Sequence, residues 1–114
     1  MGSYLVFDRK ENNTKSISDL MATIIQDVLS NVSEKEYGWW LKKKHVASLI
    51  SFTVDLLDQD ELLQSYIDSH KDVYGLKDEF EEIKNRIWWI HKCFVGTLVS
   101  MILNKEKYIM AKWE

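Results

Sequence analysis

A stripe of hydrophobic residues at helical spacing runs through residues 16–32. The apolar side chains fall at i, i+3, i+4, i+7 and i+8 and continue at that spacing, while the opposite positions are polar. Ser16 and Ser18 are both favourable N-caps, because a serine hydroxyl can accept a hydrogen bond from a free backbone amide at a helix start. The pattern therefore predicts a first amphipathic helix.

Three more helices are predicted downstream. The capping-box sequence at residues 33–36 (SEKE) predicts a second helix over residues 34–57. Acidic residues of the kind found at helix N-termini predict a short third helix over residues 59–69, and Gly75 marks a loop after it. Apolar residues spaced by three and four predict a long fourth helix over residues 77–104.

The longest apolar stretch, IWWIHKCFVGTLVSMIL at residues 87–103, lies in the fourth helix. A second apolar stripe joins the first there, so this helix must be covered on most of its sides. We expect the N-terminal segment and the tail at residues 108–113, or another molecule, to provide that cover. The stretch is short for a membrane span and contains His91 and Lys92, which favours a buried core helix.

Residues 39–52 (WWLKKKHVASLISF) and 88–101 (WWIHKCFVGTLVSM) align without a gap. Both Trp-Trp pairs coincide, and most of the other positions keep their character. Two unrelated amphipathic helices could match by accident, but the shared Trp-Trp pair favours duplication of a helical hairpin. The repeat predicts a pair of related helices with tryptophans at equal height.

The predicted fold is all-α: a four-helix bundle built from two related helical hairpins. The absence of proline and the presence of only four glycines favour long helices over a turn-rich β-sandwich. We expect residues 1–15 to form a short extended N-terminal arm and residues 16–114 to form one helical domain. The apolar run at residues 4–7 could be a strand, but no partner strand is predicted for it.

Composition limits the class of protein. The chain has 114 residues and a net charge of −3, which does not indicate nucleic-acid binding, and its single Cys93 fits a reducing compartment. No secretory signal or lipidation motif is recognised, so we expect a cytoplasmic protein that is not membrane-bound. His91 and Cys93 would point about 200° apart on a helix and cannot share a metal ion, so we expect no metal and no cofactor.

Acidic residues dominate positions 55–82, where ten carboxylates face two lysines. Solvated helix faces and the preference of carboxylates for helix N-termini explain most of this bias. The alternative is an acidic surface that docks on a basic partner.

Five tryptophans are more than a small helical bundle usually requires. Neighbouring residues on a helix point about 100° apart, so one tryptophan of each pair can be buried while the other lies at the boundary. Tryptophan is enriched among interface hot spots. The candidate partner-binding residues are Trp39, Trp40, Trp88, Trp89 and Trp113.

One pair of residues carries a catalytic alternative. Arg86 and His91 are separated by four residues, and this spacing resembles the Rx4–6H motif of HEPN ribonucleases, small helical bundles that often dimerise. The resemblance implies metal-independent RNA cleavage, with His91 as general acid or base and Arg86 stabilising the charged phosphate. It covers only these two residues and the helical class, and Ile87 departs from the usual polar residue after the arginine.

The sequence favours a small, non-enzymatic protein that binds another protein or itself as a homodimer. By analogy with acidic helical proteins of this size, it would be an inhibitor, immunity protein or adaptor of phage or bacterial accessory type. The alternative is the HEPN-like ribonuclease that uses Arg86 and His91.

Overall fold

The computed structural model describes residues 3–6, 14–30, 34–35, 38–70 and 79–113 of the chain. Nine helices and strands are defined within these residues. The helices are α1 (Asp19–Val28), α2 (Lys43–Asp58), α3 (Asp60–Ser69) and α4 (Phe80–Leu103). The strands are β1 (Ser3–Val6), β2 (Thr14–Ile17), β3 (Glu34–Lys35), β4 (Gly38–Leu41) and β5 (Ile109–Trp113).

The strands form one antiparallel sheet in the order β2-β1-β5-β4-β3. The first two strands pair as neighbours in sequence, and so do β3 and β4. Strand β5 lies between these two pairs: Leu5 of β1 and Trp39 of β4 both stand opposite Ala111. The last strand of the chain therefore joins the two halves of the sheet.

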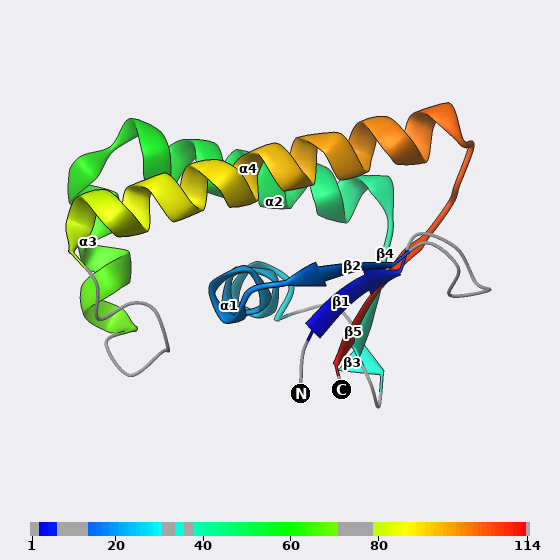
Figure 1. Cartoon of the computed structure of the whole chain (residues 1–114), viewed down its shortest axis with the longest axis horizontal. Coiled ribbons are helices and arrows are strands. Elements are labelled where there is room, and N and C mark those ends of the chain that lie inside the picture. Colours follow the sequence, from blue (N-terminus) through cyan, green and yellow to red (C-terminus); the bar gives the residue numbers. More distant parts are fainter. Residues whose placement is uncertain (1–2, 7–13, 31–33, 36–37, 71–78, 114) are drawn as a thin grey trace.

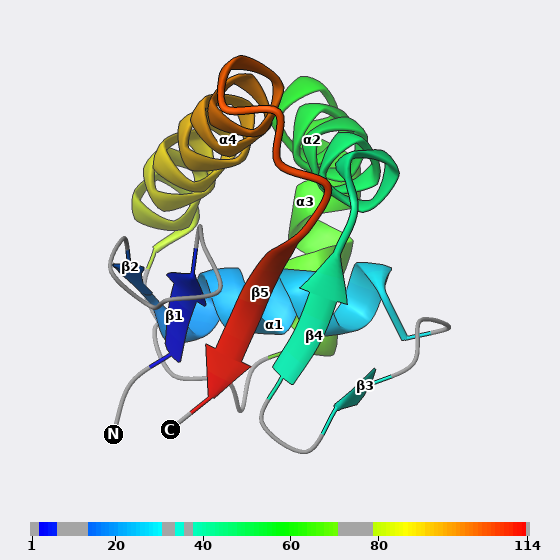
Figure 2. The same ribbon diagram turned by 90° about the vertical axis from the view of Figure 1, so that its right-hand side faces the viewer.

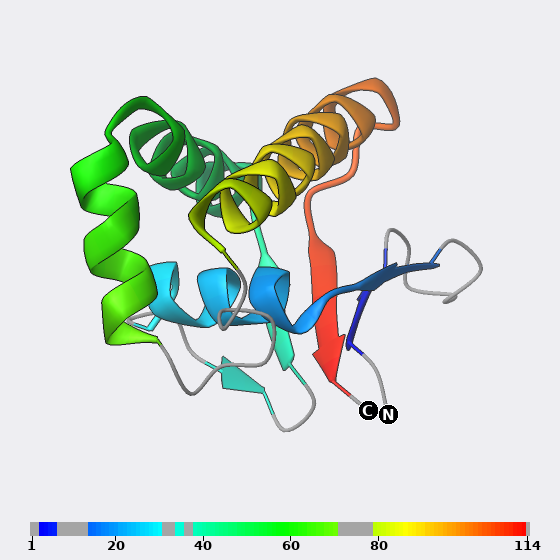
Figure 3. The ribbon, with the colours of Figure 1, turned by 60° about the vertical axis from the view of Figure 1, so that its left-hand side comes forward.

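The helices form two levels (Figures 1 and 2). Helices α2 and α4 lie side by side in the upper level, and α1 crosses below them beside the sheet. Helix α3 descends from the end of α2 toward the end of α1 (Figure 3). At about 1.5 Å per residue, α4 is about 36 Å long, close to the longest dimension of the molecule, 38 Å.

The hydrophobic core fills the space between the two helical levels. Fully buried side chains come from each helix, and Leu41 of β4 and Ile109 of β5 extend the core toward the sheet. The inner face of α4 contributes the largest share: Ile83, Ile87, Ile90, Phe94 and Met101. These positions recur at intervals of three and four, or seven, which is the spacing of one helix face.

Helix α2 begins later than the sequence predicts, and this corrects the expected range of 34–57. Residues 38–41 form β4, which pairs along its length with β5. The aromatic residues of this segment suit a strand, and pairing with β5 outweighs the local helical signal of the capping box. At the observed start, His45 Nδ1 accepts a hydrogen bond from the backbone amide of Lys42 at 2.9 Å.

Helix α4 ends in a Schellman motif. The amide of Glu106 donates to the carbonyl of Met101 at 2.9 Å, and the amide of Lys105 donates to the carbonyl of Ile102 at 3.3 Å. Lys105 takes the left-handed conformation that this motif requires, with φ of 53°. The turn stops the helix and directs residues 109–113 into the sheet as β5, so the tail does not continue the helix.

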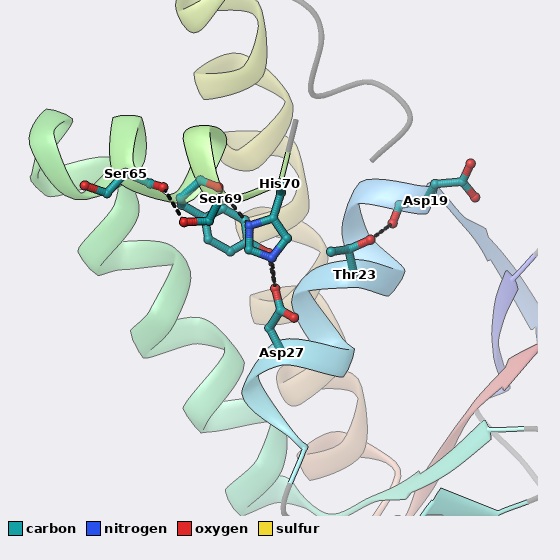
Figure 4. A network of polar contacts seen from close by, with 7 residues as sticks. Asp19, Thr23, Asp27, Ser65, Ser69 and His70 are labelled. Atoms are coloured by element: carbon teal, nitrogen blue, oxygen red, sulfur yellow. Dashed lines mark hydrogen bonds and ion pairs between the residues drawn. The ribbon is translucent and has the colours of Figure 1, made fainter. Parts of the chain in front are cut away.

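A polar network ties α1 to α3 (Figure 4). Asp27 Oδ2 accepts a hydrogen bond from the Tyr66 hydroxyl at 2.7 Å and lies 2.8 Å from His70 Nε2. The His70 ring stacks on Tyr66, and Phe52 of α2 meets Tyr66 edge to face. Burial and the hydrogen bond to Asp27 raise the pKa of Tyr66, so its hydroxyl remains a donor.

The all-α prediction is confirmed for the four helices and is wrong for the segments that form the sheet. The expected arm over residues 1–15 is also corrected, because Ser3–Val6 and Thr14–Ile17 are paired strands. Residues 3–6 have two strand partners, Thr14–Ile17 and the C-terminal strand β5. The two aligned Trp-Trp pairs do not occupy equivalent elements, since Trp39 and Trp40 lie on β4 whereas Trp88 and Trp89 lie on α4. The bundle of two related hairpins is therefore not formed.

Substitution Lys105→Gly should stabilise the protein. Glycine adopts the left-handed region without the steric conflict that a lysine Cβ introduces, so the free energy of unfolding should rise by about 1 kcal/mol. Chemical denaturation measures the change, with exposed Lys107→Gly as the control that should bring no gain. Equal effects of both substitutions would show that the left-handed turn is not strained.

The cap formed by His45 should make stability depend on pH. Burial lowers the pKa of His45 below 6.5, and the charges of Lys44 and Lys42 lower it further. His45 therefore takes up its proton at a higher pH in the unfolded chain than in the folded protein. The contribution of the neutral His45 cap to the free energy of unfolding is complete above pH 6.5 and is lost as the pH falls toward the folded-state pKa.

Substitution His45→Gln isolates this effect, because glutamine can accept the same backbone hydrogen bond without titrating. The wild type should lose unfolding free energy relative to His45→Gln as the pH falls from about 7.5 to about 5. Urea titrations at several pH values measure it. A difference that stays constant with pH would contradict the role of His45.

Candidate protein-binding surface

The outer face of α4 carries a continuous row of exposed apolar side chains. Helix α4 lies along the upper edge of the molecule in Figure 1, with α1 and the sheet below it. The exposed fraction reaches 68% for Trp89, 56% for Ile102 and 75% for Leu103. The row, called the α4 patch from here on, consists of Trp88, Trp89, Val95, Val99, Ile102 and Leu103.

The α4 patch is on the side of the helix opposite the core. At 100° per residue, its positions lie within an arc of about 140° whose centre is nearly opposite the buried arc of the same helix. Helix α4 is therefore apolar on two opposite faces from residue 88 onward. The inner face is covered by the rest of the chain, and no described segment covers the outer face.

The spacing within the α4 patch is that of a coiled-coil seam. Positions 88, 92, 95, 99 and 102 alternate intervals of four and three, and positions 89, 96 and 103 follow beside them at intervals of seven. An interval pattern of this kind keeps one side of a helix facing a second helix. The patch is therefore suited to an α-helical partner.

Gly96 lies at the middle of the α4 patch. A Cβ atom built at this position would meet nothing within 4 Å, so no contact inside the protomer requires a glycine there. Glycine inside a helix destabilises it by about 0.5–1 kcal/mol relative to alanine. A glycine without an internal steric reason is consistent with close approach of an external backbone.

Lys92 is the single charged residue on the outer face between residues 88 and 103. Its ammonium lies 5.0 Å from the centre of the Trp88 ring and 4.6 Å from that of Trp89. These are cation–π distances, and the aliphatic stem of the lysine extends over the same apolar surface. Lys92 therefore contacts both indoles on the helix surface.

The five candidate tryptophans occupy different elements. Trp88 and Trp89 are exposed on α4, with Trp88 at 46%. Trp39 and Trp40 lie on β4, opposite Ala111 and Met110 of β5, and Trp113 lies on β5 opposite Ser3. The structure thus brings two of the five together on one helical surface and places the other three in the sheet.

His91 braces α2 against α4. Its Nδ1 lies 2.9 Å from the hydroxyl of Thr53, a fully buried residue of α2, and its ring stacks on Trp88. The Thr53 hydroxyl also lies within hydrogen-bond distance of the backbone carbonyls of Leu49 and Ile50, at 3.1 and 2.9 Å. Arg86 is half-buried and stands about 140° from His91 around the helix, so one protomer does not bring the two together.

Other candidate positions have local structural explanations. Cys93 is half-buried and packs against the core. Asp60 at the start of α3 forms an ion pair with Lys84 of α4 at 2.7 Å, which joins those helices. Asp72 and Asp78 of the acidic stretch 55–82 lie outside the described residues, and no three described His, Cys, Asp or Glu side chains are grouped as metal ligands would be.

A shallow depression of about 470 Å³ opens between α1 and α2, with Val28, Phe52 and Asp55 in its lining. Its polar lining residues are Ser48, Ser51 and Asp55, and it is widely open to solvent.

Sequence reasoning identified the tryptophans but missed Gly96 and Thr53. Gly96 could have been found by placing the exposed stripe on a helical wheel, where it falls between Trp89 and Leu103. Thr53 gave no signal, because its partner His91 is 38 residues away in sequence.

No described helix is long and apolar enough to cross a membrane. Comparisons of the chain with protein-family models, curated proteins and solved structures give no match. The function is therefore inferred from the geometry of the α4 patch.

Substitution Gly96→Ala should stabilise the isolated protomer. The new methyl group meets no atom within 4 Å, and alanine favours the helix by up to about 1 kcal/mol over glycine. Thermal unfolding at low protein concentration measures the change, with Ala47→Gly on the exposed side of α2 as the reverse control. Loss of stability in Gly96→Ala would show that Gly96 has a packing role inside the protomer.

Proposed function

We propose that this protein is a non-enzymatic binding module whose docking surface is the α4 patch. The observation that supports the proposal is the exposure of six apolar side chains, including two tryptophans, in one row on the solvent side of a well-packed helix. Monomeric proteins rarely expose apolar patches beyond a few hundred Å², and larger patches mark interaction sites.

The composition of the α4 patch also supports binding. Tryptophan is enriched among interface hot spots, and Trp88 and Trp89 are both exposed, with the Lys92 ammonium at cation–π distance from each ring. Aliphatic residues on the following turns, such as Val99 and Ile102, extend the apolar surface along the helix.

The inhibitor, immunity or adaptor roles suggested by the sequence are all compatible with such a module. Each would use the α4 patch to occupy a groove or helix on another protein. The catalytic alternative at Arg86 and His91 gains no comparable observation, because the contacts of His91 with Thr53 and Trp88 already account for its position.

Substitution Val99→Asp should abolish binding, because a carboxylate would be placed at the centre of an apolar interface without a partner. Val99 is 48% exposed, so the fold should be unaffected. Tagged wild type and variant are compared by pull-down from nuclease-treated lysate of the source cell, read by mass spectrometry. Every protein bound stoichiometrically by wild type should be lost from Val99→Asp.

Substitution Leu62→Asp provides the matched control. Leu62 is an apolar residue of α3 outside the patch, and its exposure is 40%. This variant should retain the partners of wild type. Partners retained by Val99→Asp, with both variants showing native circular dichroism, would end the proposal that the α4 patch is the docking surface.

A further inference from the structure

The seam spacing, the central glycine and the exposed apolar area of α4 together identify a partner for the α4 patch. We infer that its occupant is a second copy of this chain, with the two α4 helices antiparallel and crossing near Gly96. The inference rests on the proposed function and specifies its partner.

The first argument is the symmetry of the α4 patch. It extends from residue 88 to residue 103, so its midpoint lies between Val95 and Gly96. A twofold axis at that midpoint is the isologous arrangement of a closed dimer. It would place Trp88 and Trp89 of one copy beside Ile102 and Leu103 of the other, so that each large indole meets aliphatic side chains.

The second argument is Gly96. At the crossing point of two helices, the backbones approach most closely, and a residue without a side chain permits that approach. Apart from the adjacent residues and the backbone of the same helix, no described atom lies within 4 Å of the missing Cβ position. The twofold axis therefore falls where the chain has the only glycine of the described helices.

The third argument is the helix dipole. Antiparallel pairing places the N-terminal end of each α4 near the C-terminal end of the other, which opposes the two helix dipoles favourably. Parallel pairing would align the two dipoles and bring the exposed Glu81 and Glu82 of both copies together.

The fourth argument is area. The exposed fractions of the six side chains correspond to roughly 600 Å² of apolar surface per copy; if a second copy covers all of it, the total of about 1,200 Å² reaches the lower end of the range for stable interfaces. In this arrangement Lys92 lies opposite Val99 of the second copy. A single lysine in an apolar seam lowers stability but fixes register and the number of helices.

Disulfide trapping tests the orientation. In a background that lacks the one native thiol (Cys93→Ser), Lys92→Cys and Val99→Cys are prepared separately, one of them with a tag that changes its mass. Antiparallel pairing predicts a cross-link only when the two are mixed. Two copies of Lys92→Cys would be offset by about 10 Å along the helix, too far for a disulfide.

The same experiment recognises the wrong arrangement. Parallel pairing would give efficient self-linking of Lys92→Cys and of Val99→Cys, and either result would overturn the inference. Absence of any cross-link, in the mixture as well as alone, would overturn it too.

Light scattering from about 1 µM to about 100 µM tests the dimer without cysteines. Wild type should reach twice the protomer mass, and Gly96→Leu should raise the dissociation constant at least about tenfold, because the added side chain separates the helices without touching its own protomer. The matched control is Ala47→Leu, at the exposed position of α2 that aligns with Gly96. It should leave self-association unchanged.

The outcomes separate this inference from the proposed function. A wild type that stays monomeric, or equal self-association in Gly96→Leu, overturns the antiparallel dimer. If Val99→Asp still loses a different protein partner, the binding module stands without self-association. If the monomer binds anionic lipid vesicles through Trp89 and loses no protein partner in Val99→Asp, both proposals fail.

Discussion

The packing of α4 against α2 is the contact on which the rest of the structure depends. The inner face of α4 buries Ile83, Ile87, Ile90 and Phe94 in one unbroken row. At about 1.5–3 kcal/mol for each fully buried side chain, this row supplies a large part of the driving force for folding. It also fixes the rotation of α4 about its axis, and that rotation determines which side chains face solvent.

The sheet follows from the way α4 ends. The left-handed residue Lys105 closes the helix and turns the chain so that Ile109–Trp113 can enter between β1 and β4. Without this strand, the two flanking strand pairs would be separate hairpins, which are at best marginally stable in water. A single local turn after α4 therefore connects the helical layer to the sheet.

The sequence predicted what depends on local periodicity. Helix α3 and the body of α4 lie where spacing and end signals place them, because their stabilising contacts recur at intervals of three and four. The strands could not be predicted in the same way, since the sheet depends on the pairing of β1 and β4 with β5, which lies about 70 to 110 residues away in sequence. The Trp-Trp repeat was misleading for this reason: Trp88 and Trp89 lie on a helix, whereas Trp39 and Trp40 lie on a strand.

The same constraint explains the α4 patch. A helix fixed in rotation by its inner face cannot turn its outer face inward, so Trp88, Val95 and Val99 remain exposed in the protomer. Sequence reasoning recognised that this helix required cover on most sides but could not say which residues the chain itself would cover. Since Lys92 lies against both indoles and Gly96 leaves the centre of the row free of a side chain, the outer face has the properties of a helix-pairing surface. An antiparallel second α4 satisfies the spacing, the glycine and the helix dipoles together, whereas an unrelated partner would have to match each separately.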